Sequence, residues 1–320
     1  MIGKLILRRL LISIVILFAV SLVIFFATLL LPGDPARAIL GQQATPERIE
    51  ALNREMNLND PPLTRYVMWL GGLFTGSLGT SVATGEPVSQ LLSDRVGATL
   101  VLMIAAAAIS IPAGIGLGIY SALRRGRASD TAISTGSLVL AALPEFVVGI
   151  GLVTLFSTTV FSILPAVTMS PPGTQVWQFP AQLILPTAVL VLVVTPYIAR
   201  MMRATMVEVL DSGYVEMARL KGVPERRVIW RHALPHAVGP VAQVIAIQLA
   251  WMAGGVVVVE FLFRYPGIGQ ALIDAVNYRD VQVVQAVTMI VALIYVIVNL
   301  LADIVGILTN PKLRTGGDAS

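Results

Sequence analysis

The chain has 320 residues, of which 56% are hydrophobic and only 12% are charged. A soluble globular domain carries about twice that share of charged residues, so the composition excludes an ordinary soluble protein. There is no cysteine, which excludes disulfide bonds, thiolate catalysis and cysteine-based metal sites.

Five intervals without a charged side chain are each longer than the roughly 20 residues that cross the hydrocarbon core of a bilayer as a helix. Within them the apolar residues run continuously instead of alternating with polar ones, which favours helices over the strands of a membrane barrel. We therefore predict an all-α membrane protein. The uncharged intervals are 10–33, 96–123, 146–199, 232–259 and 281–302.

The first apolar run extends from Leu10 to Leu31 and follows three cations near the start of the chain. It is longer than the core of a signal peptide, and no convincing small-residue cleavage site follows it. We therefore predict a retained membrane helix within residues 1–33. The sequence Pro32-Gly33-Asp34-Pro35 is expected to end it.

Residues 34–95 are polar enough to lie in water, and we expect them on the external side of the membrane. Thr45 is a suitable N-cap for a short helix there, and Pro46 is a suitable first helical residue. This segment either contacts an external partner or is a packed cap that only links the first two spans. The sequence leaves both alternatives open.

Further apolar stretches predict five more spans. One of them, 131–163, is too long for a single straight crossing at about 1.5 Å per residue, and Pro144 is expected to break it. Pro165, Pro171-Pro172-Gly173 and Pro180 predict a non-helical external connection. The result is six transmembrane helices, with the last five at about 98–120, 131–163, 183–206, 238–259 and 285–308, followed by a tail at 311–320.

An even number of spans puts both termini on the same side of the membrane. If the N and C termini are cytoplasmic, most of the Lys and Arg residues fall on the cytoplasmic face, as the positive-inside rule requires. The segment 207–237, between the fourth and fifth spans, is then a cytoplasmic loop, and 311–320 is a cytoplasmic tail.

The pattern of residues 207–237 is that of a helix, a turn and a second helix. Asp211 and Ser212 can begin the first helix, Gly222 can adopt the left-handed conformation that ends it, and Pro224 suits the first turn of the next. One interpretation is a basic loop that only obeys the positive-inside rule. The other is a docking hairpin shaped to enter a groove on a soluble partner.

A motif in this segment resembles a known family. Glu216-x-Ala218-x-x-x-Gly222, nine further residues and His232-x-Leu234-Pro235 resemble the EAA loop of ABC-importer permeases. Met217 and His232 depart from that motif, which has alanine and isoleucine there. Four other motifs resemble the dipeptide/oligopeptide/nickel branch, so the chain looks like its first (B-type) permease subunit: Leu31-Pro-Gly-Asp-Pro35, Leu58-Asn-Asp-Pro61, Tyr265-Pro-Gly-Ile-Gly269 and Asn277-Tyr-Arg-Asp280.

The resemblance implies a type I ABC-importer transmembrane domain over residues 96–310 in the plasma (inner) membrane of a bacterium. Its implied partners are a second homologous permease, two ATP-binding subunits or one fused ATPase, and an extracytoplasmic substrate-binding protein, with a peptide as the substrate. Coupling to the ATPase would use Tyr214, Glu216, Ala218, Arg219, Lys221, Gly222, Arg231, Leu234 and Pro235.

The chain has no Gly-x-x-x-x-Gly-Lys-Ser/Thr loop to cradle phosphates. We therefore expect no enzyme activity and no cofactor in this chain itself, with ATP and Mg bound by the ATPase partners. Nucleic acid is not expected as a partner.

Two acids within or near the spans have separate interpretations. Glu145 follows Pro144, and an ionised group at membrane depth needs a partner or a wet cavity, so it is a candidate for the transport pathway. A buried, hydrogen-bonded structural role is the alternative. Asp303 lies near the end of the last span, where an interfacial position is expected.

Pro266, Gly267 and Gly269 predict a tight turn or gate near the external mouth. No βαβ unit surrounds these glycines, so they are not a dinucleotide-binding fingerprint. His232 and His236 are four residues apart, but without an intervening acid we expect a structural role and no metal site.

The sequence is also compatible with two other functions. The same architecture could carry nickel or a nickel chelate in place of a peptide. From a different class, an ATP-independent channel or secondary carrier is conceivable, although the sequence has no filter-like repeat and no paired carboxylates at mid-membrane.

Overall fold

The computed structural model describes residues 2–30, 40, 44–55, 59–169 and 174–309. The predictions on Leu31–Pro35, on Leu58, on Pro171–Gly173 and on the tail at 311–320 lie outside these residues. Over the described ranges the chain is helical, with one isolated β-bridge between Thr80 and Pro87 and no strand. This confirms the all-α fold class.

The helices fall into three successive parts of the chain. The N-terminal part contains α1 (Ile2–Leu29), α3 (Pro46–Glu55), α4 (Pro62–Thr75) and α5 (Val88–Leu123). The middle contains α6 (Ala128–Ala142), α7 (Glu145–Val153), the π-helical turn η2 (Thr154–Thr158), the 3-10 turn η3 (Val176–Gln178) and α8 (Pro180–Leu210). The last part contains α9 (Gly213–Leu220), α10 (Glu225–Arg227), the π-helical segment η4 (Val228–Ala233), α11 (Leu234–Leu262), α12 (Ile268–Asn277) and α13 (Val281–Thr309).

Five helices of the described residues are long and apolar enough to cross a membrane, or up to six spans if the bent pair α6 and α7 counts as one. This pair occupies the predicted third span and is bent by 104°. The break falls at Leu143 and Pro144, because proline has no N–H for the helix ladder and forces the residue before it into an extended conformation.

The starts of α5 and α8 differ from the predicted span limits. α5 begins at Val88, ten residues before the apolar stretch that predicted it, because a membrane helix can continue into the aqueous phase. Pro180 was expected in a non-helical connection, but it is the first residue of α8. Proline suits that position, since its φ is already helical and its missing N–H would have no partner in the first turn.

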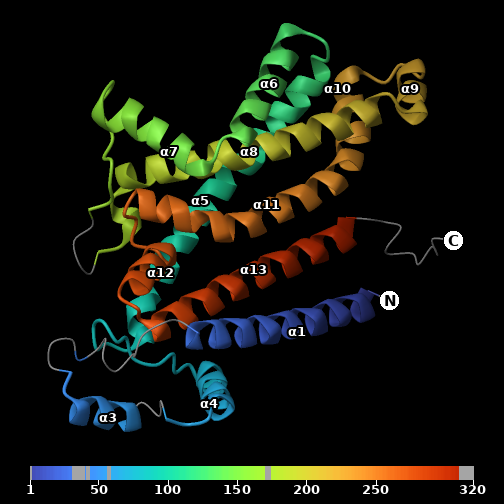
Figure 1. The fold of residues 1–320 in the computed structure, drawn as a ribbon. Helices are drawn as coiled ribbons and strands as arrows, with labels where there is room; N and C mark the ends of the chain where they lie inside the picture. The colour runs from blue at the N-terminus through green and yellow to red at the C-terminus, as the bar shows by residue number, and fades with distance from the viewer. Residues whose placement is uncertain (1, 31–39, 41–43, 56–58, 170–173, 310–320) are drawn as a thin grey trace.

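The core is formed around α8, which packs against both α5 and α11 (Figure 1). Glycines on α5 allow the close approach: a Cβ atom on Gly118 would lie 2.6 Å from the backbone oxygen of Ala199. Small residues at such contacts are how membrane helices gain van der Waals contact without a hydrophobic driving force.

α1 lies outside this core, beside α13 and next to α4 (Figure 1). An aromatic cluster of Phe25, Tyr66 and Trp69 joins α1 to α4, and Ser21 and Tyr66 share a hydrogen bond of 2.8 Å. At the other end of α1, Arg9 forms a 2.8 Å ion pair with Asp303 of α13. The beginning of α1 and the end of α13 therefore lie next to each other.

Candidate functional site

The hairpin formed by α9 and α10 projects from the bundle at one end (Figure 1). Gly222 ends α9 with φ of 77°, the left-handed conformation. Its N–H donates to the Arg219 carbonyl at 2.9 Å, and the Val223 N–H donates to the Ala218 carbonyl at 3.2 Å. These two bonds form a Schellman motif, which glycine adopts without the strain that a side chain would bring.

Arg219 holds the two helices of the hairpin together through hydrogen bonds. Its guanidinium donates to both carboxylate oxygens of Glu225, at 3.1 and 2.7 Å, and to the Leu210 carbonyl at 3.3 Å. The hydrogen bond to Glu225 raises the pKa of Arg219, so this cation stays charged at any physiological pH. The bidentate bond fixes the angle between the first and second helix of the hairpin.

One face of α9 is anchored to the protein and another is free. Val215 is fully buried, and Ala218 is half-buried. The large side chains of Tyr214, Met217 and Leu220 are 45%, 52% and 76% exposed, at the spacing that lines one side of a helix. The hairpin thus presents a partly exposed apolar stripe, of which Met217 and Leu220 are the most exposed members, as a docking helix does.

The other predicted coupling residues surround this hairpin. Tyr214 stacks edge-on against His236, with ring centroids 5.2 Å apart, which ties α9 to the start of α11. Leu234 packs against the core, whereas the remaining members are exposed: Glu216, Lys221, Arg231 and Pro235. Among the described residues, no group of three or more His, Cys, Asp or Glu side chains could hold a metal ion.

Glu145 begins α7 at the sharp bend after Pro144. One of its carboxylate oxygens, Oε2, is buried and has no hydrogen-bond partner in the described residues. It lies against α11, where a Cβ atom on Gly255 would be 2.9 Å from Oε2 and 3.1 Å from the Trp251 ring. The Glu145 carboxylate and the Trp251 ring therefore both lie beside Gly255 of α11.

A hollow of about 620 Å³ lies one turn further along α11, between α6, α8 and α11. Tyr197 at its edge reaches back toward the bend, with its hydroxyl 3.4 Å from the Ala141 carbonyl. The hollow is lined mainly by apolar side chains, with Ser134, Arg200 and Gln248 among its polar members.

The turn between α11 and α12 is built around Glu260, which is fully buried. The Thr99 hydroxyl of α5 and the Gly269 N–H each donate to its carboxylate at 2.6 Å. The Tyr265 hydroxyl donates to the Ala98 carbonyl at 2.8 Å. Gly267 has no room for a side chain, because a Cβ atom there would overlap the Glu260 carboxylate. Pro266, Gly267 and Gly269 thus form the turn that closes over α5.

Sequence reasoning missed Glu260, because it stands one residue past the predicted span. A charged residue at that position is expected where a membrane helix leaves the bilayer. A signal was present: a single acid between apolar residues, followed within nine positions by a Pro-Gly-Ile-Gly turn. Such an acid has no water to solvate it and therefore needs nearby donors.

A second missed cluster lies near the hairpin end. Asp130 of α6 is buried, and its carboxylate receives two hydrogen bonds from Arg203 of α8, at 2.6 and 2.8 Å. The Ser121 hydroxyl and the Gly126 N–H also donate to it, at 2.5 and 3.0 Å. One carboxylate thus joins α5, the loop after it, α6 and α8.

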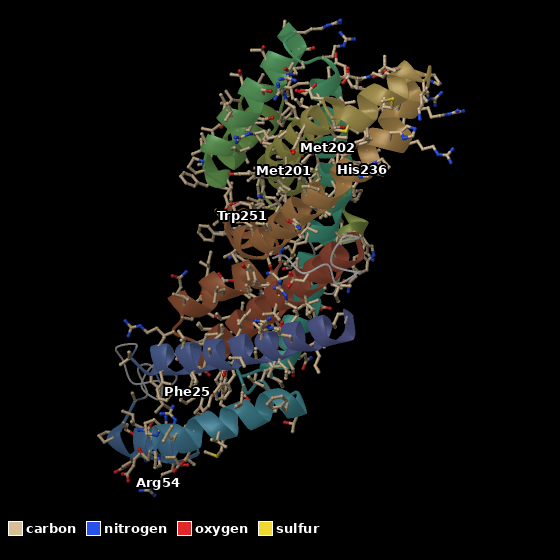
Figure 2. The ribbon with its side chains drawn as sticks, turned by 90° about the vertical axis from the view of Figure 1, so that its right-hand side faces the viewer. Phe25, Arg54, Met201, Met202, His236 and Trp251 are labelled. Carbon is tan, nitrogen blue, oxygen red and sulfur yellow. The ribbon has the colours of Figure 1, made fainter. Side chains whose placement is uncertain are left out.

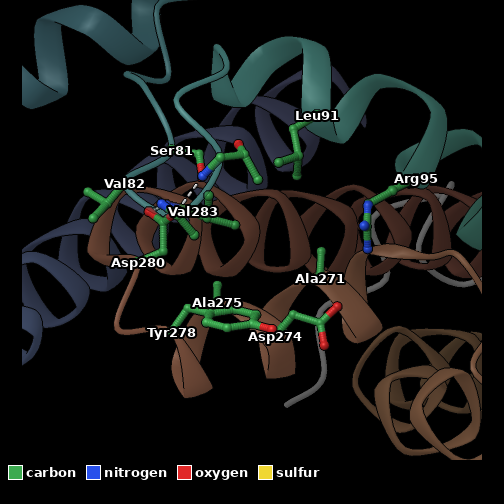
Figure 3. A pocket seen from close by; sticks show the side chains of 12 residues that line it. Ser81, Val82, Leu91, Arg95, Ala271, Asp274, Ala275, Tyr278, Asp280 and Val283 are labelled. Carbon is green, nitrogen blue, oxygen red and sulfur yellow. Dashed lines mark hydrogen bonds between the residues drawn. The ribbon is translucent and has the colours of Figure 1, made fainter. Parts of the chain in front are cut away.

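At the opposite end, part of the segment 34–95 packs on the turn between α12 and α13 (Figure 3). Asp280 accepts hydrogen bonds from the Ser81 hydroxyl and from the Ala83 N–H at 2.5 and 3.2 Å. A pocket of about 570 Å³ lies beside this contact, with Arg95 and Asp274 in its wall. Residues 80–87 are therefore held as a cap over the α12–α13 turn.

Comparison with known proteins agrees with this architecture. The family model described as "binding-protein-dependent transport system inner membrane component" matches residues 114–315, and its N-terminal counterpart matches residues 1–103. A probable peptide ABC transporter permease of Sinorhizobium fredii is 36% identical over 98% of this chain and 99% of its own.

Two further relatives are a dipeptide transport system permease of Alkalihalophilus pseudofirmus and a glutathione transport system permease of Escherichia coli. The first is 33% identical over 96% of this chain and 98% of its own. The second is 34% identical over 97% of this chain and 98% of its own.

Proposed function

Because the chain belongs to the family of binding-protein-dependent transport system inner membrane components, we propose that it is a permease subunit of an ATP-driven peptide importer. Members of this family are membrane permease subunits that work with ATPase and substrate-binding partners. The peptide substrate is supported by the names of relatives that match nearly the full chain.

The observation that carries the proposal is the projecting hairpin. Its apolar stripe of Tyr214, Met217 and Leu220 is exposed, while the hairpin itself is braced by Arg219 and the Schellman turn at Gly222. Its second helix continues without interruption into α11. A soluble ATPase that binds this stripe would transmit its movement directly to a membrane-spanning helix.

The assembly follows from this role. The subunit pairs with a second, homologous permease, contacts two ATP-binding subunits or one fused ATPase that bind ATP and Mg, and receives substrate from an extracytoplasmic binding protein. The hairpin and both termini lie on the cytoplasmic side of the bacterial inner membrane, with residues 34–95 outside. The contact of residues 80–87 with the α12–α13 turn supports a cap that also offers a surface to the binding protein.

The test is reconstitution of the complete complex in proteoliposomes with its binding protein. We expect ATP-dependent uptake of di- and tripeptides, with the second permease and the ATPases retained during purification of this chain. Uptake of nickel and not of peptides would assign the nickel alternative. Uptake that needs neither ATP nor the partners would contradict the proposal in favour of a channel or carrier.

Replacing Gly222 with valine is expected to uncouple ATP hydrolysis from peptide uptake. No atom lies within 4 Å of the place for a Cβ atom, so the effect comes from the backbone: a β-branched residue at φ of 77° is strained by about 1–2 kcal/mol. That strain opens the Schellman turn and lets the hairpin fray. The measurement is the ratio of peptide taken up to ATP hydrolysed in proteoliposomes.

The matched control is Gly222→Asn, because asparagine tolerates the left-handed conformation far better than valine. This variant should keep most of the wild-type ratio. Full coupling in Gly222→Val would count against a role for the hairpin in energy transmission.

A further inference from the structure

The hollow between α6, α8 and α11 has the composition of a site for a small molecule. Most of its wall is apolar, and a few polar groups converge on it, which is the usual pattern for ligand sites. Figure 2 shows Trp251 projecting outward from α11, below Met201 of α8. The wall comprises Ser134, Leu138, Tyr197, Arg200, Met201, Arg203, Ala204, Val244, Ile247 and Gln248.

Arg200 is the unusual member of this wall. It is exposed, and it lies within the apolar helix α8, ten residues before its end at Leu210, which is about 15 Å along the axis. The described residues offer it no hydrogen bond or ion pair, whereas Arg203, also in the wall, is bound by Asp130. A cation at this depth requires either a wet cavity or an anion, and the hollow provides the space for both.

A carboxylate with a buried, unsatisfied oxygen lies against the same helix, further along α11 than the hollow. Glu145 meets α11 at Gly255, and Gln248 of the hollow is seven residues earlier on α11. Seven residues are about two turns, so both positions share one face of the helix and are separated by about 10 Å along its axis. Trp251 lies between them on that face, and its side chain is 43% exposed.

We infer that the hollow and the face of α11 from Gln248 to Gly255, together called the groove, bind a short peptide as an extended zwitterion, with its α-ammonium group at Glu145 and its α-carboxylate at Arg200. An extended chain covers at most about 3.3–3.6 Å per residue, so a tripeptide matches the spacing of about 10 Å between Gln248, which lines the hollow with Arg200, and Gly255, which adjoins Glu145. Trp251 would pack against the backbone and the middle side chain, and Gln248, Ser134 and Tyr197 supply hydrogen bonds near Arg200. This inference rests on the proposed function and gives its substrate a length and a polarity.

The experiment compares uptake of trialanine with that of its C-terminal amide and its N-acetyl derivative. It uses the complete reconstituted complex at peptide concentrations that saturate the binding protein. The binding protein is the same in every sample, so its own preference cancels when variants are compared by the ratio of free to blocked peptide. The variants are Arg200→Gln and Glu145→Gln, with Arg127→Gln and Glu47→Gln as matched changes at exposed positions away from the groove.

We expect Arg200→Gln to reduce the preference for the free carboxylate about tenfold and to leave the preference for the free amine unchanged, since a hydrogen bond to a charged group is worth about that factor. Glu145→Gln should do the reverse. Arg200→Lys, which keeps the cation, should restore most of the first preference. The two control variants should behave as wild type.

Several outcomes would overturn the inference. If Arg200→Gln and Glu145→Gln keep both ratios at wild-type values while peptide uptake persists, the groove is not a peptide site and the second permease covers it instead. An equal change of both ratios in either variant would mean a general loss of function and no recognition of the peptide ends. If the wild-type complex takes up no peptide at all, the proposed function fails first.

Discussion

Replacing Asp130 with alanine is expected to lower the free energy of unfolding by about 3 kcal/mol. The carboxylate is buried and accepts five hydrogen bonds, so its loss leaves several donors without a partner. The donors are Arg203, Ser121, Gly126 and Ser134. Arg203 is one third exposed and can recover part of its hydration, which keeps the cost at the lower end of that for a buried ion pair. The measurement is thermal or denaturant unfolding of the purified protein in detergent.

Two controls separate the ion pair from a general effect of losing an acid. Asp94→Ala removes an exposed carboxylate and should change stability by less than about 0.5 kcal/mol. The double variant Asp130→Ala with Arg203→Leu removes both charges and should recover part of the loss, because the cation is then no longer left unpaired. A double variant less stable than Asp130→Ala alone would contradict this account.

Replacing Gly267 with alanine is expected to cost about 3 kcal/mol as well, for a different reason. The added methyl group overlaps the carboxylate of Glu260, which is fully buried and held by Thr99 and the Gly269 N–H. Glu260 must then move and break these hydrogen bonds, or the turn must open. Either change detaches α12 from α5, so peptide uptake should fall together with the unfolding temperature.

Gly254→Ala is the matched control for this substitution. Gly254 lies in the same part of the chain, in the middle of α11, and nothing lies within 4 Å of the place for its Cβ atom. Alanine should be neutral there or stabilise the helix by up to about 1 kcal/mol. Wild-type stability in Gly267→Ala would mean that Glu260 does not fill the space behind the turn.

The membrane helices and the hairpin could be predicted because each follows from a local pattern. Continuous apolar runs predict spanning helices, and Gly222 followed by Pro224 predicts an end and a new start within a few residues. The description of the matching family model is consistent with that fold and with the resemblance to ABC-importer permeases.

Two kinds of feature could not be predicted from the sequence. One is the angle between successive helices, and the other is contact between residues far apart in the chain. Pro144 predicts a break but not a bend of 104°. Glu260 and Thr99 are 161 positions apart, and Asp130 and Arg203 are 73 apart. No local pattern indicates which of the polar side chains in two separate spans will meet.

The helix that begins in the hairpin has a mechanical consequence. α10, η4 and α11 form one continuous helix of 38 residues from Glu225 to Leu262, which is about 57 Å long. Its two irregular points, the π-helical segment and Pro240, both lie near the hairpin, so bending is concentrated there. The remaining length acts as a rigid lever. A displacement of the hairpin is therefore converted into a change of bend angle at these two points, and the regular part of the helix up to Glu260 moves as one rigid body.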